Sequence, residues 1–214
     1  MAVIVPTLDR EAAAWADARL LVGVDEVGRG PLAGPVVAAA VVLPPACAAE
    51  ALAGVRDSKT LPAARRAALE ARIRAVALGI GLGAASVAEI DRFNIRRATA
   101  LAMRRALARL AARVSADERP WRVLVDGLPV PELGCAHDAL VDGDAHCVSI
   151  AAAGIVAKTV RDRLMLHLAR RHPGYAWESN MGYGTAAHHA GLRALGPTRH
   201  HRRSFGPVAQ LGLL

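Results

Sequence analysis

The most constraining feature of the chain is a glycine-rich segment that joins two apolar runs near the N-terminus. The first run covers residues 20–27, the second covers residues 35–43, and valine and alanine dominate the second. The linking segment, residues 28–34, contains three glycines and a proline. Apolar runs of this length bounded by glycine and proline are typical of β-strands. We therefore expect an antiparallel pair of strands joined by a tight connection.

Acidic residues mark the end of the first run and two later positions. Asp25 and Glu26 precede the glycines directly, Asp126 ends an apolar run, and Asp144 lies in a polar gap beside apolar sequence. Carboxylates brought together repel one another unless a cation neutralises them. An all-oxygen ligand set favours Mg²⁺ or Mn²⁺ over zinc. The four acids are therefore candidates for one metal-dependent catalytic site.

A geometric difficulty affects the two adjacent acids. On a regular strand Asp25 and Glu26 point to opposite faces. Both reach one metal site only if the strand twists, bulges or ends there, or if one of them uses the adjoining turn. The flanking glycines, Gly28 and Gly30, favour such a departure from regular geometry.

The rest of the chain alternates helical and strand patterns. Helices are expected at residues 62–78, 94–114, 149–171 and 185–195, and strands at residues 79–86, 121–126 and 140–141. Strands that come first and then alternate with helices fit a mixed sheet flanked by helices. We predict an α/β fold, with residues 1–18 as an N-terminal extension and residues 19–214 as one domain that ends in a small helical region.

The charge of the chain favours a polyanionic partner. The formal net charge is +8 and the sequence pI is about 10.6, although a basic protein without such a partner is the plain alternative. No window approaches the ~20 unbroken apolar residues of a membrane span, and no basic region followed by an apolar one opens the chain. We therefore expect a cytoplasmic protein.

Several weaker patterns have two interpretations each. Residues 79–83 alternate glycine with aliphatic residues, but the spacing does not match a phosphate-binding loop, so a strand is the better interpretation. The adjacent histidine pairs at 188–189 and 200–201 are poorly placed to share a metal. We interpret these histidines as solvated or phosphate-facing, and the Arg202-Arg203 pair as a contact to backbone phosphate.

Eight blocks of sequence carry a family resemblance. They are residues 24–35 (VDEVGRGPLAGP), 57–59 (DSK), 94–95 (NI), 124–127 (LVDG), 143–144 (GD), 155–158 (IVAK) with 161–162 (RD), 182–185 (GYGT) and 200–205 (HHRRSF). In this order, from about residue 20 to residue 208, the blocks resemble bacterial ribonuclease HII. The resemblance implies an RNase H-like fold: a mixed sheet flanked by helices.

The resemblance also implies an activity. It implies an endonuclease that hydrolyses the RNA strand of RNA–DNA hybrids and cuts 5′ to single ribonucleotides in duplex DNA, leaving 3′-hydroxyl and 5′-phosphate ends, in ribonucleotide excision and in DNA replication and repair. By position, Asp25, Glu26, Asp126 and Asp144 match the catalytic carboxylates, which would bind Mg²⁺ or Mn²⁺ and activate water. We expect a monomer whose partners are RNA–DNA hybrid and ribonucleotide-containing duplex.

Substrate contacts are implied in the same way. The Gly28-Arg29-Gly30 turn matches the family turn that contacts the ribose 2′-hydroxyl, a group that both donates and accepts hydrogen bonds. Tyr183 matches the tyrosine that packs at the RNA–DNA junction. Tyr183 also has an ordinary structural interpretation, as a half-buried loop aromatic.

Lysine occurs only at Lys59 and Lys158, and both lie within the family blocks. We consider both to be substrate-binding candidates, and whether they bind phosphate or brace the acids stays open. The chain departs from the family at two positions: serine is usual where Gly154 stands, and lysine is frequent where Met181 stands. Neither departure touches the four acids, so we expect activity to survive.

Two rival functions need comparison. A related metal nuclease of the same fold could act on all-DNA junctions, but the pairing of the glycine–arginine–glycine turn with Tyr183 argues against it. A non-catalytic module could bind hybrids without cutting them, but intact acids at all four positions argue against that.

Overall fold

The computed structural model describes residues 5–45, 47–114 and 119–210. Its centre is a five-stranded sheet with the strand order β3-β2-β1-β4-β5. The strands are β1 (Leu20–Val27), β2 (Val36–Val42), β3 (Gly79–Ala85), β4 (Trp121–Asp126) and β5 (Asp138–Leu140). The pairs β1–β2 and β2–β3 are antiparallel, whereas β1–β4 and β4–β5 are parallel. The predicted mixed sheet is confirmed.

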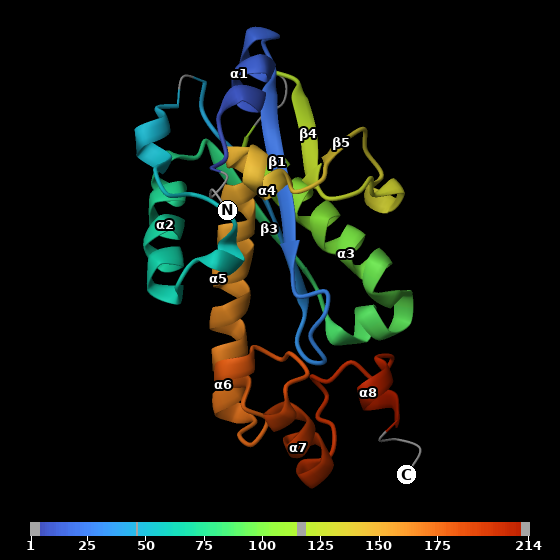
Figure 1. The fold of residues 1–214 in the computed structure, drawn as a ribbon. Helices are drawn as coiled ribbons and strands as arrows, with labels where there is room; N and C mark the ends of the chain where they lie inside the picture. Colours follow the sequence, from blue (N-terminus) through green and yellow to red (C-terminus); the bar gives the residue numbers. More distant parts are fainter. Residues whose placement is uncertain (1–4, 46, 115–118, 211–214) are drawn as a thin grey trace.

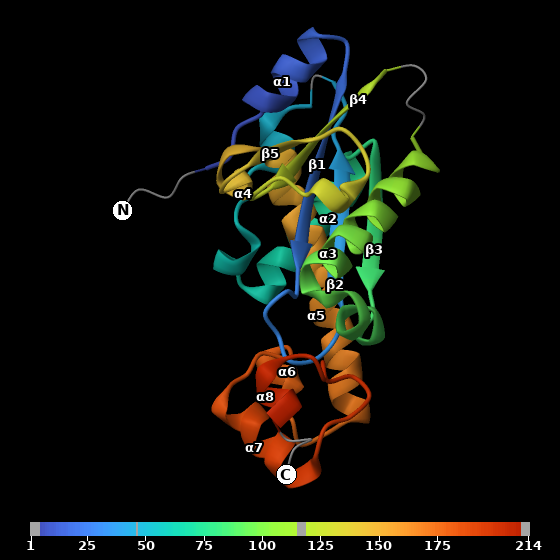
Figure 2. The same cartoon turned by 90° about the vertical axis from the view of Figure 1, so that its right-hand side faces the viewer.

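Helices cover both faces of this sheet (Figure 1). They are α1 (Asp9–Ala16), α2 (Ala63–Val76), α3 (Val87–Ala111), α4 (Gly143–His146), α5 (Val148–Arg171), α6 (Trp177–Asn180), α7 (Ala186–Leu195) and α8 (Gly206–Ala209), with short 3₁₀ turns η1 (Ala49–Leu52), η2 (Ser58–Thr60) and η3 (Pro131–Leu133). The helix α3 packs on one face, and α5 with α2 packs on the other. Figure 2 shows α6, α7 and α8 grouped beyond one end of the sheet.

The central strands are built for close helix packing. Every residue of β2 is buried, and its alternating side chains are valine and alanine on both faces. The glycines of β3 let α3 approach still more closely, since a Cβ at Gly81 would collide with the carbonyl oxygen of Ala106 and one at Gly83 with that of Ala102. The prediction of a strand at residues 79–83 is confirmed.

The boundary of one helix differs from the prediction. The helix expected from residue 94 begins instead at Val87, because Ser86 and Glu89 form a capping box there. The chain breaks helical geometry at Asn94, which has φ 69°, and its side-chain oxygen then accepts a hydrogen bond from the amide of Arg97 at 3.1 Å. Asn94, the predicted start of this helix, therefore caps the second helical segment of α3.

The N-terminal helix is tied to the start of α5 by a buried acid. One carboxylate oxygen of Glu11 accepts hydrogen bonds from the amide of Ser149 at 2.7 Å and from its hydroxyl at 2.6 Å. An acid at a helix N-terminus is stabilised by the free amides of the first turn. The division of the chain at residue 18 stays a prediction. Within the described ranges, no helix is both long and apolar enough to cross a membrane.

Two buried histidines link the C-terminal helices. The Nδ1 of His188 lies 2.9 Å from the carbonyl oxygen of Tyr183, so it carries a proton, and its Nε2 accepts from the indole of Trp177 at 3.0 Å. The Nε2 of His201 lies 3.0 Å from the same nitrogen, while the amide of Thr198 donates to its Nδ1. This arrangement fits two neutral rings. The interpretation of these two histidines as solvated or phosphate-facing is wrong, because both are fully buried.

This buried pair predicts acid sensitivity. Burial, and then the neighbouring His188, lower the pKa of His201 to about 4, and burial also lowers that of His188. Further titratable groups around the pair are His172, His189 and His200. A lowered histidine pKa stabilises the fold above the unfolded value of about 6.5, and this contribution is lost as the pH falls toward about 4.

The unfolding free energy should therefore depend less strongly on pH when His201 is replaced. Between about pH 7.5 and about pH 5 we expect wild-type protein to lose about 2 kcal/mol of unfolding free energy from this site, and His201→Gln to lose less. Urea unfolding of both proteins at about pH 7.5 and about pH 5 measures the difference. An identical loss in the two proteins would contradict the prediction.

Candidate active site

Three of the four predicted acids lie at one end of neighbouring parallel strands. Asp25 and Glu26 come near the end of β1, and Asp126 is the last residue of β4. Because Val24 is paired with Val125, the next residues along, Asp25 and Asp126, are lateral neighbours. The carboxyl ends of parallel strands meet at one edge of a sheet, which is where such sheets place their sites.

The fourth acid reaches this edge from a short helix. Asp144 lies in α4, directly after β5. The amide of its neighbour Gly143 donates a 2.7 Å hydrogen bond to Oδ1 of Asp126. This bond connects α4 to the end of β4. The carboxylate of Asp144 is consequently close enough to raise the pKa of Asp25.

The two adjacent acids leave β1 on opposite faces. The pairing of β1 with β2 continues without interruption to Val27, so the strand stays regular through both acids. Asp25 faces α5, where a Cβ at Gly154 would collide with its Oδ2, and Glu26 lines a cavity on the α3 side. As these side chains stand, no three His, Cys, Asp or Glu residues of the described ranges are grouped to hold a metal ion.

The acids are nevertheless coupled through their charges. Burial raises the pKa of Asp25 well above its usual value, and Glu26, Asp126 and Asp144 raise it further. Burial also raises the pKa of Glu26, while the nearby Arg29 opposes this change. For Asp144, burial and then Asp126 raise the pKa. The site therefore concentrates negative charge that protons or a cation must offset.

One predicted lysine lies within this field and the other is paired elsewhere. Burial disfavours the charged form of Lys59, but Asp25 and other acids of the site outweigh it and raise its pKa. The ammonium of Lys158 instead donates to Asp162 at 2.8 Å, and that same carboxylate accepts from Arg66 at 2.9 Å. The structure thus brings Lys59 into the electrostatic field of the four acids, whereas the ammonium of Lys158 is paired with Asp162.

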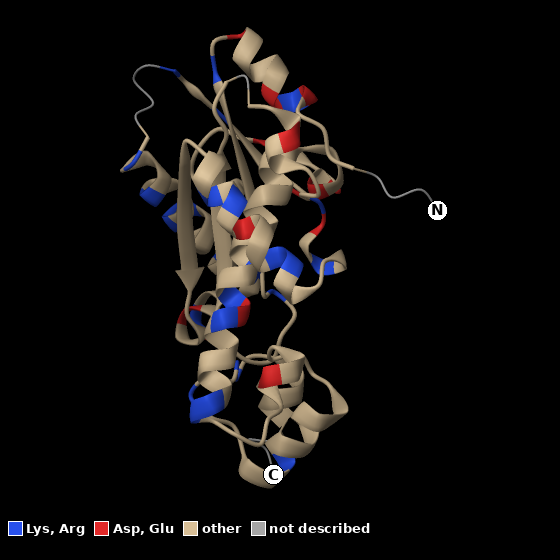
Figure 3. Cartoon of the chain, turned by 90° about the vertical axis from the view of Figure 1, so that its left-hand side faces the viewer, with Lys and Arg blue, Asp and Glu red and all other residues tan. Residues whose placement is uncertain are grey.

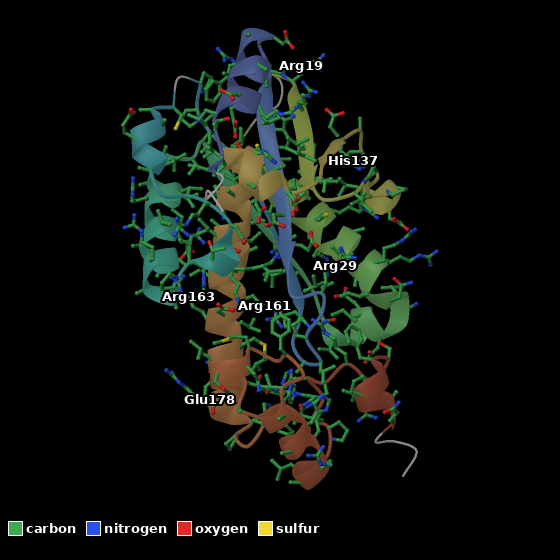
Figure 4. The ribbon with its side chains drawn as sticks, viewed as in Figure 1. Arg19, Arg29, His137, Arg161, Arg163 and Glu178 are labelled. Carbon is green, nitrogen blue, oxygen red and sulfur yellow. The ribbon has the colours of Figure 1, made fainter. Side chains whose placement is uncertain are left out.

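The predicted substrate turn and the predicted tyrosine are neighbours. Gly28 has φ 96°, a left-handed conformation that favours glycine. A Cβ at Gly30 would lie 3.7 Å from Cε1 of Tyr183, which is 44% exposed. Arg29 lies 3.4 Å from Glu26, so the turn also adjoins the acids. Figure 4 shows Arg29 beside the end of β1.

A cavity of about 390 Å³ opens beside the acids. Its lining includes Glu26, Arg29 and Asp126, together with residues of α3 and the segment 127–132. The α3 residues Arg96 and Thr99 were not predicted, because nothing in a helical repeat marks the side that lies next to a sheet edge. Asp57 was quoted in a block but not as a site residue, although it contributes to the electrostatic environment of Lys59.

Comparisons with known proteins place these features in a family. Residues 22–208 match the family model described as Ribonuclease HII. A "Ribonuclease HII" of Synechococcus sp. is 52% identical over 98% of this chain and 92% of its own. Among solved structures, the ribonuclease H2 from Pyrococcus horikoshii OT3 has a TM-score of 0.70 at 21% identity, covering 90% of this chain and 96% of its own.

A second solved structure shares the fold. Bst-RNase HIII in complex with Mn²⁺ has a TM-score of 0.73 at 21% identity, covering 92% of this chain and 70% of its own. The predicted RNase H-like architecture is therefore confirmed. Together with the matched sequence blocks, these findings show that the chain belongs to the ribonuclease HII family and is a ribonuclease H.

Proposed function

We propose that this ribonuclease H hydrolyses the RNA strand of RNA–DNA hybrids and cuts 5′ to single ribonucleotides in duplex DNA. The observation that carries the proposal is the adjacency of the coupled acids, the glycine turn and Tyr183. The side chain of Arg29 in the turn lies 3.4 Å from Glu26, and a Cβ at Gly30 would lie 3.7 Å from the ring of Tyr183. A sugar held in the turn would thus lie beside the acids.

The acids Asp25, Glu26, Asp126 and Asp144 would hold a divalent ion, either Mg²⁺ or Mn²⁺. Their oxygen ligands suit both ions. Burial, and then the neighbouring carboxylates Glu26 and Asp126, raise the pKa of Asp25, so a cation at this site would be stabilised by its charged form. The Mn²⁺ complex of the related RNase HIII is consistent with this assignment. When bound, such an ion supplies Lewis-acid activation of water and of phosphate oxygens. Closing the site around it requires the side chains on the two faces of β1 to turn toward the sheet edge.

The residues of the chain would then orient the substrate. The backbone of Gly28, Arg29 and Gly30 would contact the ribose 2′-hydroxyl, and Tyr183 would stack at the junction with DNA. Water attacks phosphorus in line while the bond from phosphorus to the 3′ oxygen breaks. The upstream strand keeps a 3′-hydroxyl, and the downstream strand carries a 5′-phosphate.

The charge distribution supports a nucleic-acid partner. Figure 3 shows basic residues along α2 and α5, and the net charge of +8 favours a polyanion. Lys59 and Lys158 are proposed as substrate contacts, with Lys59 the better placed because it lies in the field of the acids. We further propose a cytoplasmic monomer that acts in ribonucleotide excision during DNA replication and repair, with residues 19–214 as the catalytic domain and residues 1–18 as an extension.

The substrate assignment is tested with three matched duplexes: all-DNA, DNA with one ribonucleotide, and RNA–DNA hybrid. We expect cleavage of the last two only, with the embedded ribonucleotide cut on its 5′ side in the presence of Mg²⁺ or Mn²⁺. Asp25→Asn should lower kcat by roughly a thousandfold or more, since it removes a ligand of the activating ion. Glu178→Gln, at an exposed position of the helix α6, is the control.

Equal cutting of all-DNA duplex would favour the related DNA nuclease. Tight binding of hybrid by wild-type protein without any cleavage would favour the non-catalytic module. Full activity of Asp25→Asn would show that the acids are not the site.

Gly154 lies next to Asp25, so the expectation that neither departure from the family touches the acids is wrong at this position, and the contact gives a second prediction. A Cβ at Gly154 would collide with Oδ2 of Asp25, the movable end of that side chain, and would lie 3.8 Å from Oγ of Ser58, an ordinary contact. We therefore expect Gly154→Ser to stay within about threefold of wild-type kcat, and Gly154→Val to lose about a hundredfold because a branched side chain displaces the carboxylate. Steady-state kinetics on the single-ribonucleotide duplex measure both, with Gly206→Ala as a control in open space. Wild-type kcat in the valine variant would contradict the prediction.

A further inference from the structure

Two buried arginines lie beneath the turn that joins β1 to β2. Arg161 comes from α5, as Figure 4 shows, and Arg202 from the segment before α8. Both have 0% exposure, and within the described ranges neither forms a salt bridge. The prediction that Arg202 contacts phosphate is therefore wrong. A buried guanidinium without an anion must satisfy its N–H groups in another way.

Arg202 satisfies them with carbonyl oxygens of the turn. It donates to Gly28 at 2.5 Å, to Arg29 at 2.9 Å, and to Gly34 at 2.8 and 3.0 Å. Its guanidinium also lies over the ring of Phe205, 5.0 Å from the centroid. The planar fork of arginine reaches several acceptors at once, which the ammonium of lysine cannot do in this geometry.

Arg161 connects the same turn to the segment that carries Tyr183. It donates to the carbonyl oxygens of Pro35 at 3.0 Å and Ala33 at 3.1 Å, and to that of Met181 at 3.0 Å. The two arginines thus fix the inward side of the turn and hold it against the C-terminal helical region. Neither contact involves a side chain of the turn, so the arginines act on the backbone.

The outward side of the turn follows from peptide geometry. No peptide bond in the described chain is cis, and in a planar trans peptide the carbonyl and the N–H point in opposite directions. Because the carbonyls of Gly28 and Arg29 point inward to Arg202, the amides of Arg29 and Gly30 point outward. Both residues are exposed, and neither amide donates a hydrogen bond to any described residue.

Two features make these amides better donors than ordinary exposed ones. The cation bound to each carbonyl polarises the peptide and strengthens the hydrogen bond that its N–H can donate. Burial lowers the pKa of Arg202 to about 9 and also lowers that of Arg161, but a pKa of about 9 still leaves Arg202 charged at neutral pH. The positive charge therefore stays behind the turn when substrate arrives.

We infer that Arg161 and Arg202 are positioning residues that present the amides of Arg29 and Gly30 to the 2′-oxygen of the substrate ribose. This inference rests on the proposed function, which places a ribonucleotide at the turn. It adds that recognition of the ribose is set by two arginines that do not touch the substrate. A purely structural brace would hold the turn without affecting the difference between ribose and deoxyribose.

The test compares binding of two duplexes that differ by one 2′-hydroxyl. Fluorescence anisotropy in metal-free buffer gives the dissociation constants of a single-ribonucleotide duplex and of its all-DNA counterpart, without cleavage. In Arg202→Lys we expect the preference for the ribonucleotide duplex to fall about tenfold or more, while all-DNA binding stays unchanged. Arg161→Lys is the second variant, and the exposed Arg170→Lys on α5 is the matched control.

A direct readout on wild-type protein does not depend on the variants folding. Addition of the single-ribonucleotide duplex should shift the ¹⁵N-amide resonances of Arg29 and Gly30 more than all-DNA duplex does. Unchanged preference in both folded lysine variants, an equal loss on both duplexes, or equal amide shifts would overturn the inference. If wild-type protein itself shows no preference in binding or in cleavage, the proposed function fails, and the inference fails with it.

Discussion

The mutual repulsion of carboxylates at the end of β1 is the constraint on which the rest of the structure depends. Asp25 is buried beside Glu26 and within the field of Asp126 and Asp144, so its charged form is disfavoured from several directions. The arrangement persists because β1 is fixed by β2 on one side and by β4 on the other. The sheet thus holds together charges that would separate on a flexible chain, and it leaves them ready for a cation.

The helix α5 aligns the parts of the site along a single rigid element. Its first turn receives Glu11 from α1, Gly154 leaves room for Asp25, and Arg161 holds the turn and the segment before Tyr183. An uninterrupted helix from Val148 to Arg171 fixes these contacts relative to one another. The positions of the acids, the substrate turn and the C-terminal helices are therefore linked through one backbone.

The features that could be predicted from the sequence are those marked by neighbouring residues or by the family blocks. The strands around residues 28–34, the strand at residues 79–85 and the long helices follow from turn residues and periodicity. Asp25, Glu26 and Asp126 follow from strand ends, and Asp144 from a polar gap within a family block. The buried roles of Arg202 and His201 did not follow, because a charged or polar residue within a polar run is normally exposed. Contacts across more than a hundred residues, such as Arg202 with Gly28, leave no local pattern in one sequence.

The central claim is that the four acids form a repulsive cluster that a divalent ion relieves. Urea unfolding of wild-type protein and Asp25→Asn, each with EDTA and with Mn²⁺, tests it most directly. Without metal, Asp25→Asn should be more stable by about 1 kcal/mol or more because a buried repulsive charge is removed. Mn²⁺ should stabilise the wild type and have little effect on the variant. A less stable variant, or equal stabilisation of both proteins by Mn²⁺, would contradict the account.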